Sequence, residues 1–441
     1  MNDAEDISFA PIFAGATLGV LLEIIATLVD EIVVGNILND SAFAAVNLIE
    51  PFTLFENFVA YLVTVAGAAL IMRANGAKDH NKMEELFSQT MILCGICGSI
   101  LTLIYVLFTP GLVRFVANDP AVYDYALDYF NMIRFYPFVD MFDTFLFAYV
   151  LYRGGNVQFY SAIVLRIGAN ALLSWQLGLR MGIAGIGLAS ILSLLIALAV
   201  KLTFLLSSKH GLSFRWYFDL GEVFELIRLG FPESFISVCV VVMELFLNRF
   251  TLDNYGVAGV AAVALVINIF EFTLYLSEGI SEFELVAVND SIGKSSSRSM
   301  DRAVKITKRA AYIEGLVLVV IIFCASGVLP EAFDIDDKET ARLAAVMLKI
   351  IAPSVVFICM SRITAIFYQY TKRLTRTLIL FGMSITVLPV LFGEAFGRIR
   401  VEGIAIGMAA GPAVAMFLMY LFVRYIRKEG LFDYELLHLN G

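Results

Sequence analysis

Acidic residues lie inside segments that are otherwise apolar, and they carry the most suggestive chemistry of this sequence. Asp30 lies near the middle of the apolar stretch 9–38, with Glu23 seven residues before it and Glu31 directly after it. Seven residues bring Glu23 and Asp30 to nearly one helical face, whereas Glu31 points about 100° away from Asp30. An ionised carboxylate at the centre of a bilayer costs about 2.5–3.5 kcal/mol, so such groups usually face water, an ion or a partner. These residues are therefore candidates for binding H⁺, Na⁺ or a cationic solute.

A second group of polar residues follows in the first half of the chain. Asp140 and Asp143 are about one helical turn apart. Arg166 and Asn170 are also one turn apart, and Ser174 follows one turn later. The basic side chain of Arg166 can pair with either of these aspartates or with the one in the first apolar stretch. The alternative is that Arg166 is a structural ion-pair partner that takes no part in binding.

The second half of the chain is equally acidic. Glu244 and Asn248 lie one turn apart in the segment 223–252. Glu271, Glu278 and Glu282 follow at spacings of seven and four, which places them on one helical face. Because a row of three like charges is not tenable in lipid, the row must face water, a cation or basic partners. The basic candidates are Arg249, Lys349 and Arg362. The alternative is that each acid is held in a structural salt bridge.

Other kinds of chemistry find little support. Cys94 and Cys97 form a C-x-x-C inside an apolar span beside glycines, which favours helix packing over metal or redox chemistry. The three histidines lack metal-ligand spacing, and the glycines of 182–187 are interpreted as packing residues. A net charge of −9 argues against a nucleic-acid partner. We therefore expect no enzymatic activity, no bound metal and no cofactor.

The composition indicates a membrane protein with many spans. The 441 residues are 60% hydrophobic and 16% charged, with a mean hydropathy of +0.83. Soluble proteins carry about 45–50% apolar and about 25% charged residues. A span needs about 20 apolar residues, and the breaks in the sequence predict twelve of them. They cover residues 9–38, 43–72, 86–108, 123–151, 159–179, 184–207, 223–252, 257–288, 306–329, 340–369, 377–397 and 403–424.

Loop charges predict the orientation in the membrane. Basic residues follow the even-numbered spans, for example Arg298, Arg302 and Lys305 after the eighth, whereas most loops after odd-numbered spans are acidic or nearly neutral. The positive-inside rule therefore places both termini in the cytoplasm. Residues 1–6 are acidic, so we expect the first span to be retained and not cleaved as a signal peptide. The compact loops favour the plasma membrane of a prokaryote.

The two halves of the sequence repeat one another. The matching landmarks are Asp30, Gly35, Ala44-Ala45-Val46 and Asn75-Gly76 in the first half, and Asn248, Gly256, Ala261-Ala262-Val263 and Asn289-Asp290 in the second. Six spans per half in one orientation predict an all-α fold of twelve transmembrane helices. The helices would form two six-helix bundles related by a pseudo-two-fold axis along the membrane normal. We predict an N-terminal lobe over 1–207, a cytoplasmic linker over 208–222 and a C-terminal lobe over 223–441.

Segments spread over most of the chain resemble the multidrug and toxic compound extrusion (MATE) family. The segments that carry the resemblance are Val29-Asp30, Val34-Gly35, Ala44-Ala45-Val46, Pro51, Ala74-Asn75-Gly76-Ala77, Tyr152-Arg153-Gly154-Gly155-Asn156, Leu247-Asn248-Arg249-Phe250, Tyr255-Gly256-Val257, Phe367-Tyr368-Gln369-Tyr370-Thr371-Lys372, Gly403-Ile404-Ala405 and Gly411-Pro412. Each piece is weak alone, but their order and spacing over twelve spans make the match specific.

The resemblance implies an antiporter in which inward H⁺ or Na⁺ drives a solute outward, and it singles out Asp30. Family members that use the second lobe keep acids in spans 7 and 8, to which Glu244 and Glu271 are nearest in kind. An acid-lined cavity favours organic cations or drugs as small-molecule substrates, carried by a monomer in the lipid bilayer. The alternatives are a flippase of a lipid-linked saccharide, a transporter of a specific metabolite such as a polyamine, and, ranked last, a non-transporting sensor or membrane enzyme.

The sequence departs from the family pattern at two places. Members that use the N-terminal lobe carry an Asn and an Asp four apart in span 5, where this chain has Asn170 and Ser174, so the second carboxylate is missing. Many members have a proline within span 1, whereas here Pro11 lies near its start. These differences indicate a divergent member with its own substrate.

Overall fold

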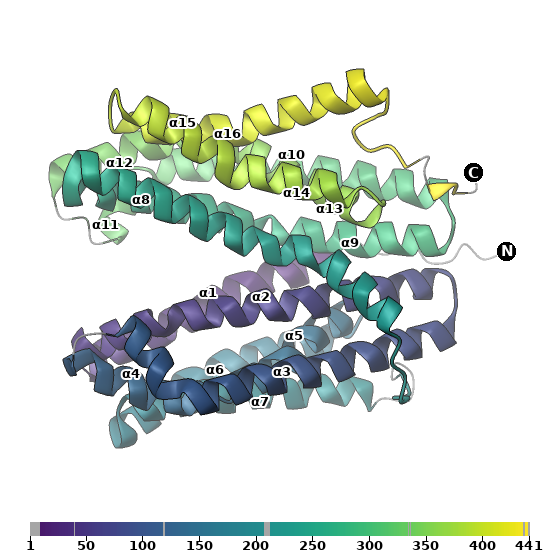
Figure 1. Cartoon of the computed structure of the whole chain (residues 1–441), viewed down its shortest axis with the longest axis horizontal. Coiled ribbons are helices and arrows are strands. Elements are labelled where there is room, and N and C mark those ends of the chain that lie inside the picture. The colour runs from purple at the N-terminus through teal and green to yellow at the C-terminus, as the bar shows by residue number, and fades with distance from the viewer. Residues whose placement is uncertain are drawn as a thin grey trace. The chain divides into compact units, whose positions relative to one another are not determined.

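The computed structural model describes residues 9–38, 40–117, 120–206, 212–333, 335, 337–434 and 437–439. It describes the side chains of these residues except those of 20, 22–32, 35, 36, 40, 43, 47, 50, 121, 257, 258 and 332. The described residues form helices and no strands (Figure 1). The chain divides into two compact units, one of residues 10–234 and one of residues 235–441 with 1–9.

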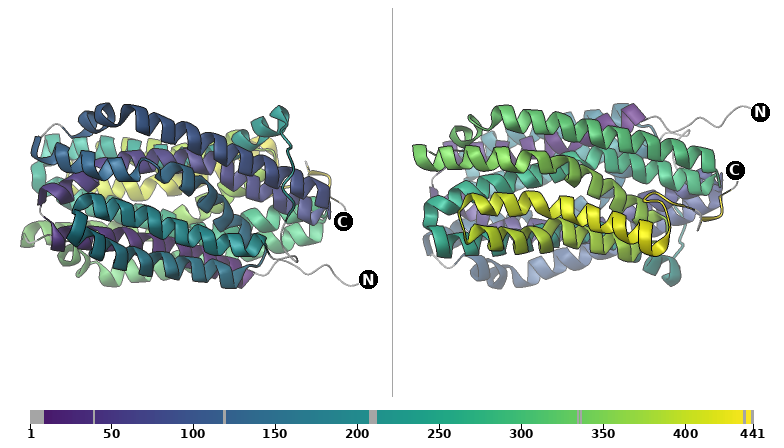
Figure 2. Two further views of the ribbon diagram at one scale, coloured as in Figure 1. Left: turned by 90° about the horizontal axis from the view of Figure 1, so that it is seen from below. Right: turned by 90° about the horizontal axis from the view of Figure 1, so that it is seen from above.

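The first unit is a bundle of long helices that run side by side (Figure 2). Its helices are α1 (Phe9–Ile37), α2 (Asp40–Gly76), α3 (His80–Val116), α4 (Pro120–Ile133), α5 (Tyr136–Tyr152), α6 (Asn156–Met181), α7 (Ile183–Leu205) and the start of α8 (Leu220–Leu276). α2 packs on α3, α4 and α5, and α6 packs on α7. Gly185 allows the last contact, because a Cβ there would lie 2.2 Å from the carbonyl oxygen of Leu177.

The second unit repeats this arrangement of packed helices. After α8 come α9 (Glu278–Gly293), α10 (Ser297–Ala325), α11 (Leu329–Ala332), α12 (Lys338–Ile351), η1 (Ala352–Ser354), α13 (Val355–Tyr370), α14 (Leu374–Phe381), η2 (Gly382–Val387), α15 (Leu388–Gly397), α16 (Glu402–Leu421) and η3 (Phe422–Arg427). α10 packs on α9 and α13, and α15 packs on α16. Glycines again allow close approach, since a Cβ on Gly407 would lie 2.1 Å from the backbone nitrogen of Gly393.

The predicted spans fall on these helices, with three differences in detail. Within the described residues nine helices are long and apolar enough to cross a membrane. The other three predicted spans fall on α1, on α10 and on the pair α4 and α5. The single span predicted over 123–151 is two helices, with Pro137 in the first turn of α5, where a proline is tolerated because that N–H has no helical partner. α8 holds one span and the first part of the next, which continues through α9. The two meet near Gly256, whose φ of 66° is left-handed and favours glycine.

The boundary between the units lies inside α8, between Ser234 and Phe235. The first turns of α8 pack on α2, where the Ser234 hydroxyl donates to the carbonyl oxygen of Phe58 at 2.7 Å. Gly230 lies against Leu62 so closely that a Cβ would be 2.1 Å from its carbonyl oxygen. Span 7 therefore begins on the first unit, although the sequence predicted that the second lobe starts at residue 223.

The described part of the linker, residues 212–219, is an extended segment attached to the start of α3. Glu84 accepts the Ser213 N–H at 3.2 Å and pairs with Arg215 at 2.5 Å. Ser88 Oγ accepts the Arg215 N–H at 2.9 Å, and Gln89 Oε1 accepts the Asp219 N–H at 2.9 Å. Three buried side chains, spaced four and one along α3, thus satisfy backbone donors that would otherwise need water. The linker is a strap held on the first unit.

The C-terminal tail, residues 428–434, packs back onto the second unit in a comparable way. Arg376 donates to Glu429 at 2.8 Å, and the Phe432 ring packs on Phe367 with centroids 5.2 Å apart. The Tyr434 hydroxyl donates to Asp301 on α10 at 2.9 Å. A polar segment therefore packs on α3 in the first unit and on α10, α13 and α14 in the second.

Candidate functional sites

The first unit holds a buried ion pair between α5 and α7. Lys201 Nζ lies 2.7 Å from Asp143 Oδ2 and 3.3 Å from the Asp143 carbonyl oxygen, and the two residues are 2% and 3% exposed. Arg166 from α6 approaches the same carboxylate at 3.9 Å and donates to the Tyr136 hydroxyl at 3.0 Å. One carboxylate is thus shared by two cations. Its other oxygen, Oδ1, is buried and has no hydrogen-bond partner among the described residues.

Lys201 is a site residue that the sequence analysis missed. It is the one charged residue in α7, whose other 22 positions are uncharged. A lone ammonium in so apolar a span needs a partner or water, since burying it unpaired costs several kcal/mol. That signal was present in the sequence, but nothing in the sequence identifies Asp143 as the partner.

Two further acids lie near this pair. Glu56 from α2 is 2% exposed, and its Oε2 atom has no hydrogen-bond partner in the described part of the chain. Asp140, one turn before Asp143, is buried within electrostatic range of Glu56 and of Lys201. The first cluster therefore comprises three acids and two bases: Glu56, Asp140, Asp143, Arg166 and Lys201.

The structure brings Asn170 and Ser174 together, as their spacing predicts. Asn170 Oδ1 accepts from the Ser174 hydroxyl at 3.5 Å and from the Ser193 hydroxyl of α7 at 3.4 Å. All three side chains are buried. Ser174 stands where other family members carry an aspartate, so these contacts join α6 to α7 through neutral groups.

The second unit has the opposite arrangement around Arg362 of α13. The Arg362 side chain is 5% exposed; its Nε donates to the Ser281 hydroxyl at 3.0 Å, and its Nη2 lies 4.0 Å from Glu278 Oε2. Glu282 of α9 and Glu314 of α10 lie within electrostatic range of the same guanidinium. The second cluster therefore comprises one base and three acids: Arg362, Glu278, Glu282 and Glu314.

Two carboxylates of the second cluster have an unsatisfied oxygen. Oε2 of Glu282 and Oε2 of Glu314 are both buried and lack a hydrogen-bond partner among the residues that the structure describes. A buried, unpaired carboxylate oxygen is costly unless a proton or a cation satisfies it. One guanidinium cannot neutralise three carboxylates, so this cluster has the capacity to take up positive charge.

The sequence analysis did not select two of these acids, Glu284 and Glu314. Glu284 is fully buried on α9 beside Thr307 of α10, and neither of its carboxylate oxygens has a hydrogen-bond partner within the described ranges. Both residues lie in predicted spans, where an acid is by itself a reason to consider a residue as part of a site.

The remaining predicted residues lie outside these clusters or outside the described side chains. Glu244 is exposed and accepts from the Asn248 amide at 3.4 Å, so it is not the buried acid that its mid-span position suggests. Glu271 is half-buried. Glu23, Asp30 and Glu31 belong to the backbone of α1, but their side chains lie outside the described residues.

The basic partners of the acid row are also decided by the structure. Of the three candidates, Arg362 contacts the row. Arg249 is exposed beside Asp253 at 4.0 Å, and Lys349 lies 5.7 Å from the ring centroid of Phe323. The row itself is divided, because α8 ends at Leu276 and α9 begins at Glu278.

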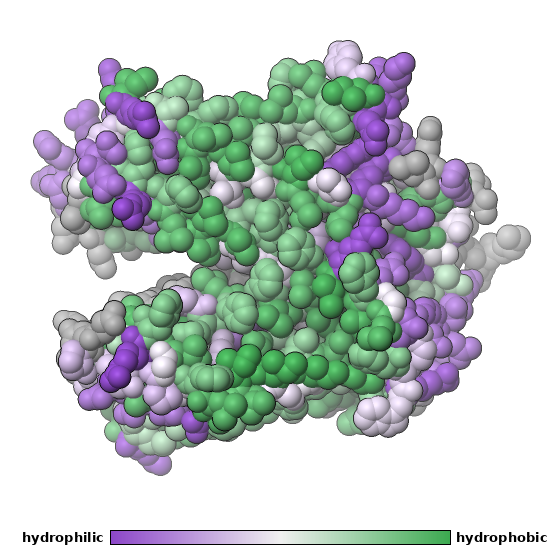
Figure 3. Space-filling model, viewed as in Figure 1, coloured by the Kyte–Doolittle hydropathy of each residue, from purple (hydrophilic) through white to green (hydrophobic). Residues whose placement is uncertain are grey.

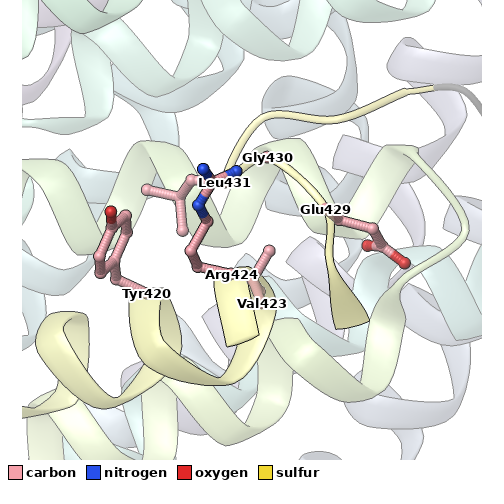
Figure 4. Close-up of a pocket in the computed structure, with 6 residues that line it drawn as sticks. All are labelled: Tyr420, Val423, Arg424, Glu429, Gly430 and Leu431. Atoms are coloured by element: carbon pink, nitrogen blue, oxygen red, sulfur yellow. The ribbon is translucent and has the colours of Figure 1, made fainter. Parts of the chain in front are cut away.

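One cavity lies apart from both clusters. Its volume is about 180 Å³, and it is lined by Tyr420, Val423, Arg424, Glu429, Gly430 and Leu431 at the junction of η3 and the tail (Figure 4). The Glu429 carboxylate points away from Arg424 in Figure 4. It accepts a hydrogen bond from Arg376 at 2.8 Å. This cavity is smaller than the roughly 300–1,000 Å³ typical of ligand pockets.

The described residues contain no group of three or more His, Cys, Asp or Glu arranged to hold a metal.

Glycines beside the C-x-x-C motif lie in a region of close helix packing. Cys94 and Cys97 are free thiols. A Cβ on the neighbouring Gly98 would lie 2.9 Å from the Cα of Phe138, so α3 and α5 approach each other closely at this point.

Two units of long apolar helices, each with a charge cluster among its helices, are typical of a polytopic membrane transporter. On the face drawn in Figure 3, apolar side chains cover the middle of each unit and polar side chains gather at its ends. The sequence model of the MatE family matches residues 16–175 and 232–393, one match in each half. The chain belongs to this family of multidrug and toxic compound extrusion transporters, and it has their all-α fold of twelve transmembrane helices in two lobes.

Characterised relatives match the chain over nearly its whole length. It is 24% identical to the "Probable multidrug resistance protein YoeA" of Bacillus subtilis (strain 168), covering 93% of this chain and 91% of that one. It is 22% identical to the "Multidrug export protein MepA" of Staphylococcus haemolyticus (strain JCSC1435), covering 93% and 92%.

Solved structures of similar fold cover the chain equally well. One is described as the "Outward-facing conformation of a multidrug resistance MATE family transporter of the MOP superfamily" and has a TM-score of 0.86 at 20% identity. A MATE in the bent conformation has a TM-score of 0.85 at 20% identity. The first match covers 95% of both chains, and the second covers 95% of this chain and 94% of that one.

Proposed function

We propose that this chain is a cation-coupled antiporter that exports organic cations or drugs, driven by inward H⁺ or Na⁺. It would work in the plasma membrane, with both termini in the cytoplasm. The observation that carries the proposal is the second cluster, where Arg362 lies 4.0 Å from Glu278 and within electrostatic range of Glu282 and Glu314. The relatives named for multidrug resistance and export support an exporter of drug-like solutes.

Coupling follows from the charge balance of that cluster. Its acids come from α9 and α10 and its base from α13, so a bound proton or Na⁺ changes the electrostatic energy of contacts among three helices. An ion shifts a conformational equilibrium by as much as its affinity differs between the two states. Binding at the orphaned oxygens of Glu282 and Glu314 would therefore favour one conformation of the lobe, as alternating access requires.

The solute class follows from the excess of acids over bases. Both clusters contain more carboxylates than cations, which favours a positively charged solute such as an organic cation or a polyamine. Aromatic side chains such as Tyr136, which accepts from Arg166, offer further contacts for a cation. A flippase for a lipid-linked saccharide has less support, because its anionic substrate would need an excess of bases.

The test is transport in liposomes with imposed pH or Na⁺ gradients, using a lipophilic cation and a polyamine as probes. We expect Glu282→Gln and Glu314→Gln each to lower gradient-driven export by about tenfold or more while solute binding without a gradient persists. Glu331→Gln, which removes an exposed acid from α11, is the matched control and should retain wild-type export. Full gradient-driven export in both cluster variants would reject the second cluster as the coupling site.

A second arm tests the antiport proposal as a whole. Wild-type protein that moves neither probe under either gradient would reject cation export. In that case the acids of both clusters would serve stability or a different substrate. An Asp30→Asn variant measured alongside reports whether the first lobe contributes to coupling, as the family resemblance implies.

A further inference from the structure

The start of α10 presents four basic side chains in one line. Arg298, Arg302, Lys305 and Arg309 follow one another at spacings of four, three and four, and all four are exposed. With 3.6 residues per turn they point within about 60° of one another, along about 16 Å of helix. We call these four residues the basic stripe. Its opposite side packs inward through Met300, Ala303, Val304 and Thr307, which are buried.

The same line continues into apolar residues without a change of direction. Tyr312, Leu316, Val320 and Phe323 are 48%, 59%, 62% and 54% exposed, and they extend the spacing of the stripe by three, four, four and three. In a membrane protein, exposed apolar residues on a span face the acyl chains. The change from Arg309 to Tyr312 therefore marks where α10 leaves the hydrocarbon, and the basic stripe lies at and beyond headgroup level.

Neighbouring segments occupy the flank of α10 and leave the stripe exposed. Asp301 accepts from the Tyr434 hydroxyl, and Lys308 Nζ lies 5.3 Å from the ring centroid of Phe432. Both residues point about 60° or more to one side of the stripe. The C-terminal tail thus covers that flank, and the four cations remain at the surface.

The corresponding helix of the first unit lacks such a stripe. α3 begins with His80, Lys82, Glu84 and Glu85, and Glu84 and Gln89 hold the linker strap. Of these two corresponding helices, α10 has the basic stripe and α3 does not. The stripe is therefore not explained by the repeat of the two halves.

We propose that the basic stripe binds the headgroups of anionic phospholipids in the leaflet at the start of α10. Guanidinium groups form paired hydrogen bonds with phosphate oxygens, and four to eight basic residues beside a transmembrane helix are typical of an anionic-lipid site. The apolar continuation of the stripe provides the matching surface for the acyl chains. The inference is independent of the solute and of the coupling ion.

The experiment uses the full chain in a neutral detergent and native mass spectrometry, titrated with phosphatidylglycerol and, separately, with phosphatidylcholine. We expect wild type to bind phosphatidylglycerol at least tenfold more tightly than phosphatidylcholine. The fourfold variant Arg298→Gln, Arg302→Gln, Lys305→Gln and Arg309→Gln should lose that preference. A variant with Lys at the three arginines should keep most of it. Inorganic phosphate at the same concentrations is the probe for simple anion binding and should not compete.

The matched control removes the same number of exposed cations at the far ends of the spans. It combines Lys338→Gln, Arg342→Gln, Arg398→Gln and Arg400→Gln. We expect this variant to keep the wild-type lipid preference within about twofold. Equal lipid preference in the stripe variant and wild type would overturn the proposal, and so would an equal loss in both fourfold variants. Thermal unfolding in detergent checks that the stripe variant is folded.

Discussion

The two units carry charge clusters of opposite arrangement. In the first, the carboxylate of Asp143 lies between two cations, Lys201 and Arg166. In the second, the guanidinium of Arg362 lies among three carboxylates. The sequence repeat places both central residues on corresponding helices, α5 and α13, each of which ends just before a basic loop. The same arrangement of helices can therefore position a central residue of either sign of charge. The balance of acids and bases around that residue determines what each lobe can bind.

The balance differs in a way that matters for coupling. Each cluster has two acids with an orphaned oxygen, which are Glu56 and Asp143 in the first and Glu282 and Glu314 in the second. The first cluster pairs its central acid with Lys201 at 2.7 Å and has two bases for three acids. The nearest cross-helix ion pair of the second cluster is 4.0 Å long, and its one base faces three acids. The first cluster is therefore closer to neutrality, and the second has the larger excess of negative charge.

Breaking the short pair of the first unit should have the largest effect. Lys201→Met leaves Asp143 buried with the more distant Arg166 as its cation, and breaking a buried pair in this way costs about 3–5 kcal/mol. We expect a loss of that size in the free energy of unfolding, measured by denaturant titration in detergent. The double variant Lys201→Met with Asp143→Leu should recover most of it, because apolar replacement of both partners is often nearly neutral. A loss below about 1 kcal/mol in the single variant would contradict the structural role of the pair.

Removing Arg362, the central base of the second cluster, should have the second largest effect on stability. Arg362→Met leaves three acids without their cation and also removes the donor to Ser281. Because its carboxylate contact is longer, we expect a smaller loss of about 2–3 kcal/mol, with gradient-driven transport reduced more strongly than stability. Adding Glu282→Gln should restore part of the stability, since it removes one of the repelling charges. No recovery in the double variant would mean that the acids do not act as one cluster.

Releasing the linker strap from the first unit should have a smaller effect on stability. Glu84→Ala removes the acceptor for the Ser213 N–H and the partner of Arg215, and it should release the linker at a cost of about 1–2 kcal/mol. Faster trypsin cleavage at Arg215 is the direct measurement. Glu85→Ala is the control, because its pairing with Lys82 at 3.4 Å is half-exposed and contributes little. Equal cleavage rates in the two variants would show that Glu84 does not hold the strap.

The attachment of the C-terminal tail to the second unit should weaken at low pH. Hydrogen bonding from Arg376 lowers the pKa of Glu429, and Arg373 adds to this effect. A lowered pKa in the folded state means that Glu429 stabilises the tail above its usual pKa of about 4.3 and loses this contribution as the pH falls through the folded value. We expect the tail to be cleaved faster by an acid-active protease as the pH falls below about 4. The contribution is below about 1 kcal/mol, because the group is partly exposed and screened by solvent. Glu429→Gln should abolish the pH dependence; if the dependence persists in that variant, another group is responsible.

Much of this protein was determined by its sequence. Composition alone requires a polytopic helical membrane protein, because so apolar a chain cannot be kept in water and its backbone must satisfy its own hydrogen bonds in lipid. The breaks located the spans, and the repeat predicted two equivalent halves. These features are local in the chain, so the periodicity of a helix is enough to predict them.

Only the tertiary structure decided which charges meet. Lys201 pairs with Asp143, and not with Asp140 one turn away, because of how α7 is rotated and how far it is shifted along α5. Arg362, and neither Arg249 nor Lys349, reaches Glu278, and Glu314 joins the cluster from α10. Such contacts depend on the packing of neighbouring helices, where glycines such as Gly98 and Gly185 set the distance between backbones. A helix turned by one residue points its side chains about 100° away, so the ionic partners of this protein are a property of its packing and cannot be derived from spacing along the chain.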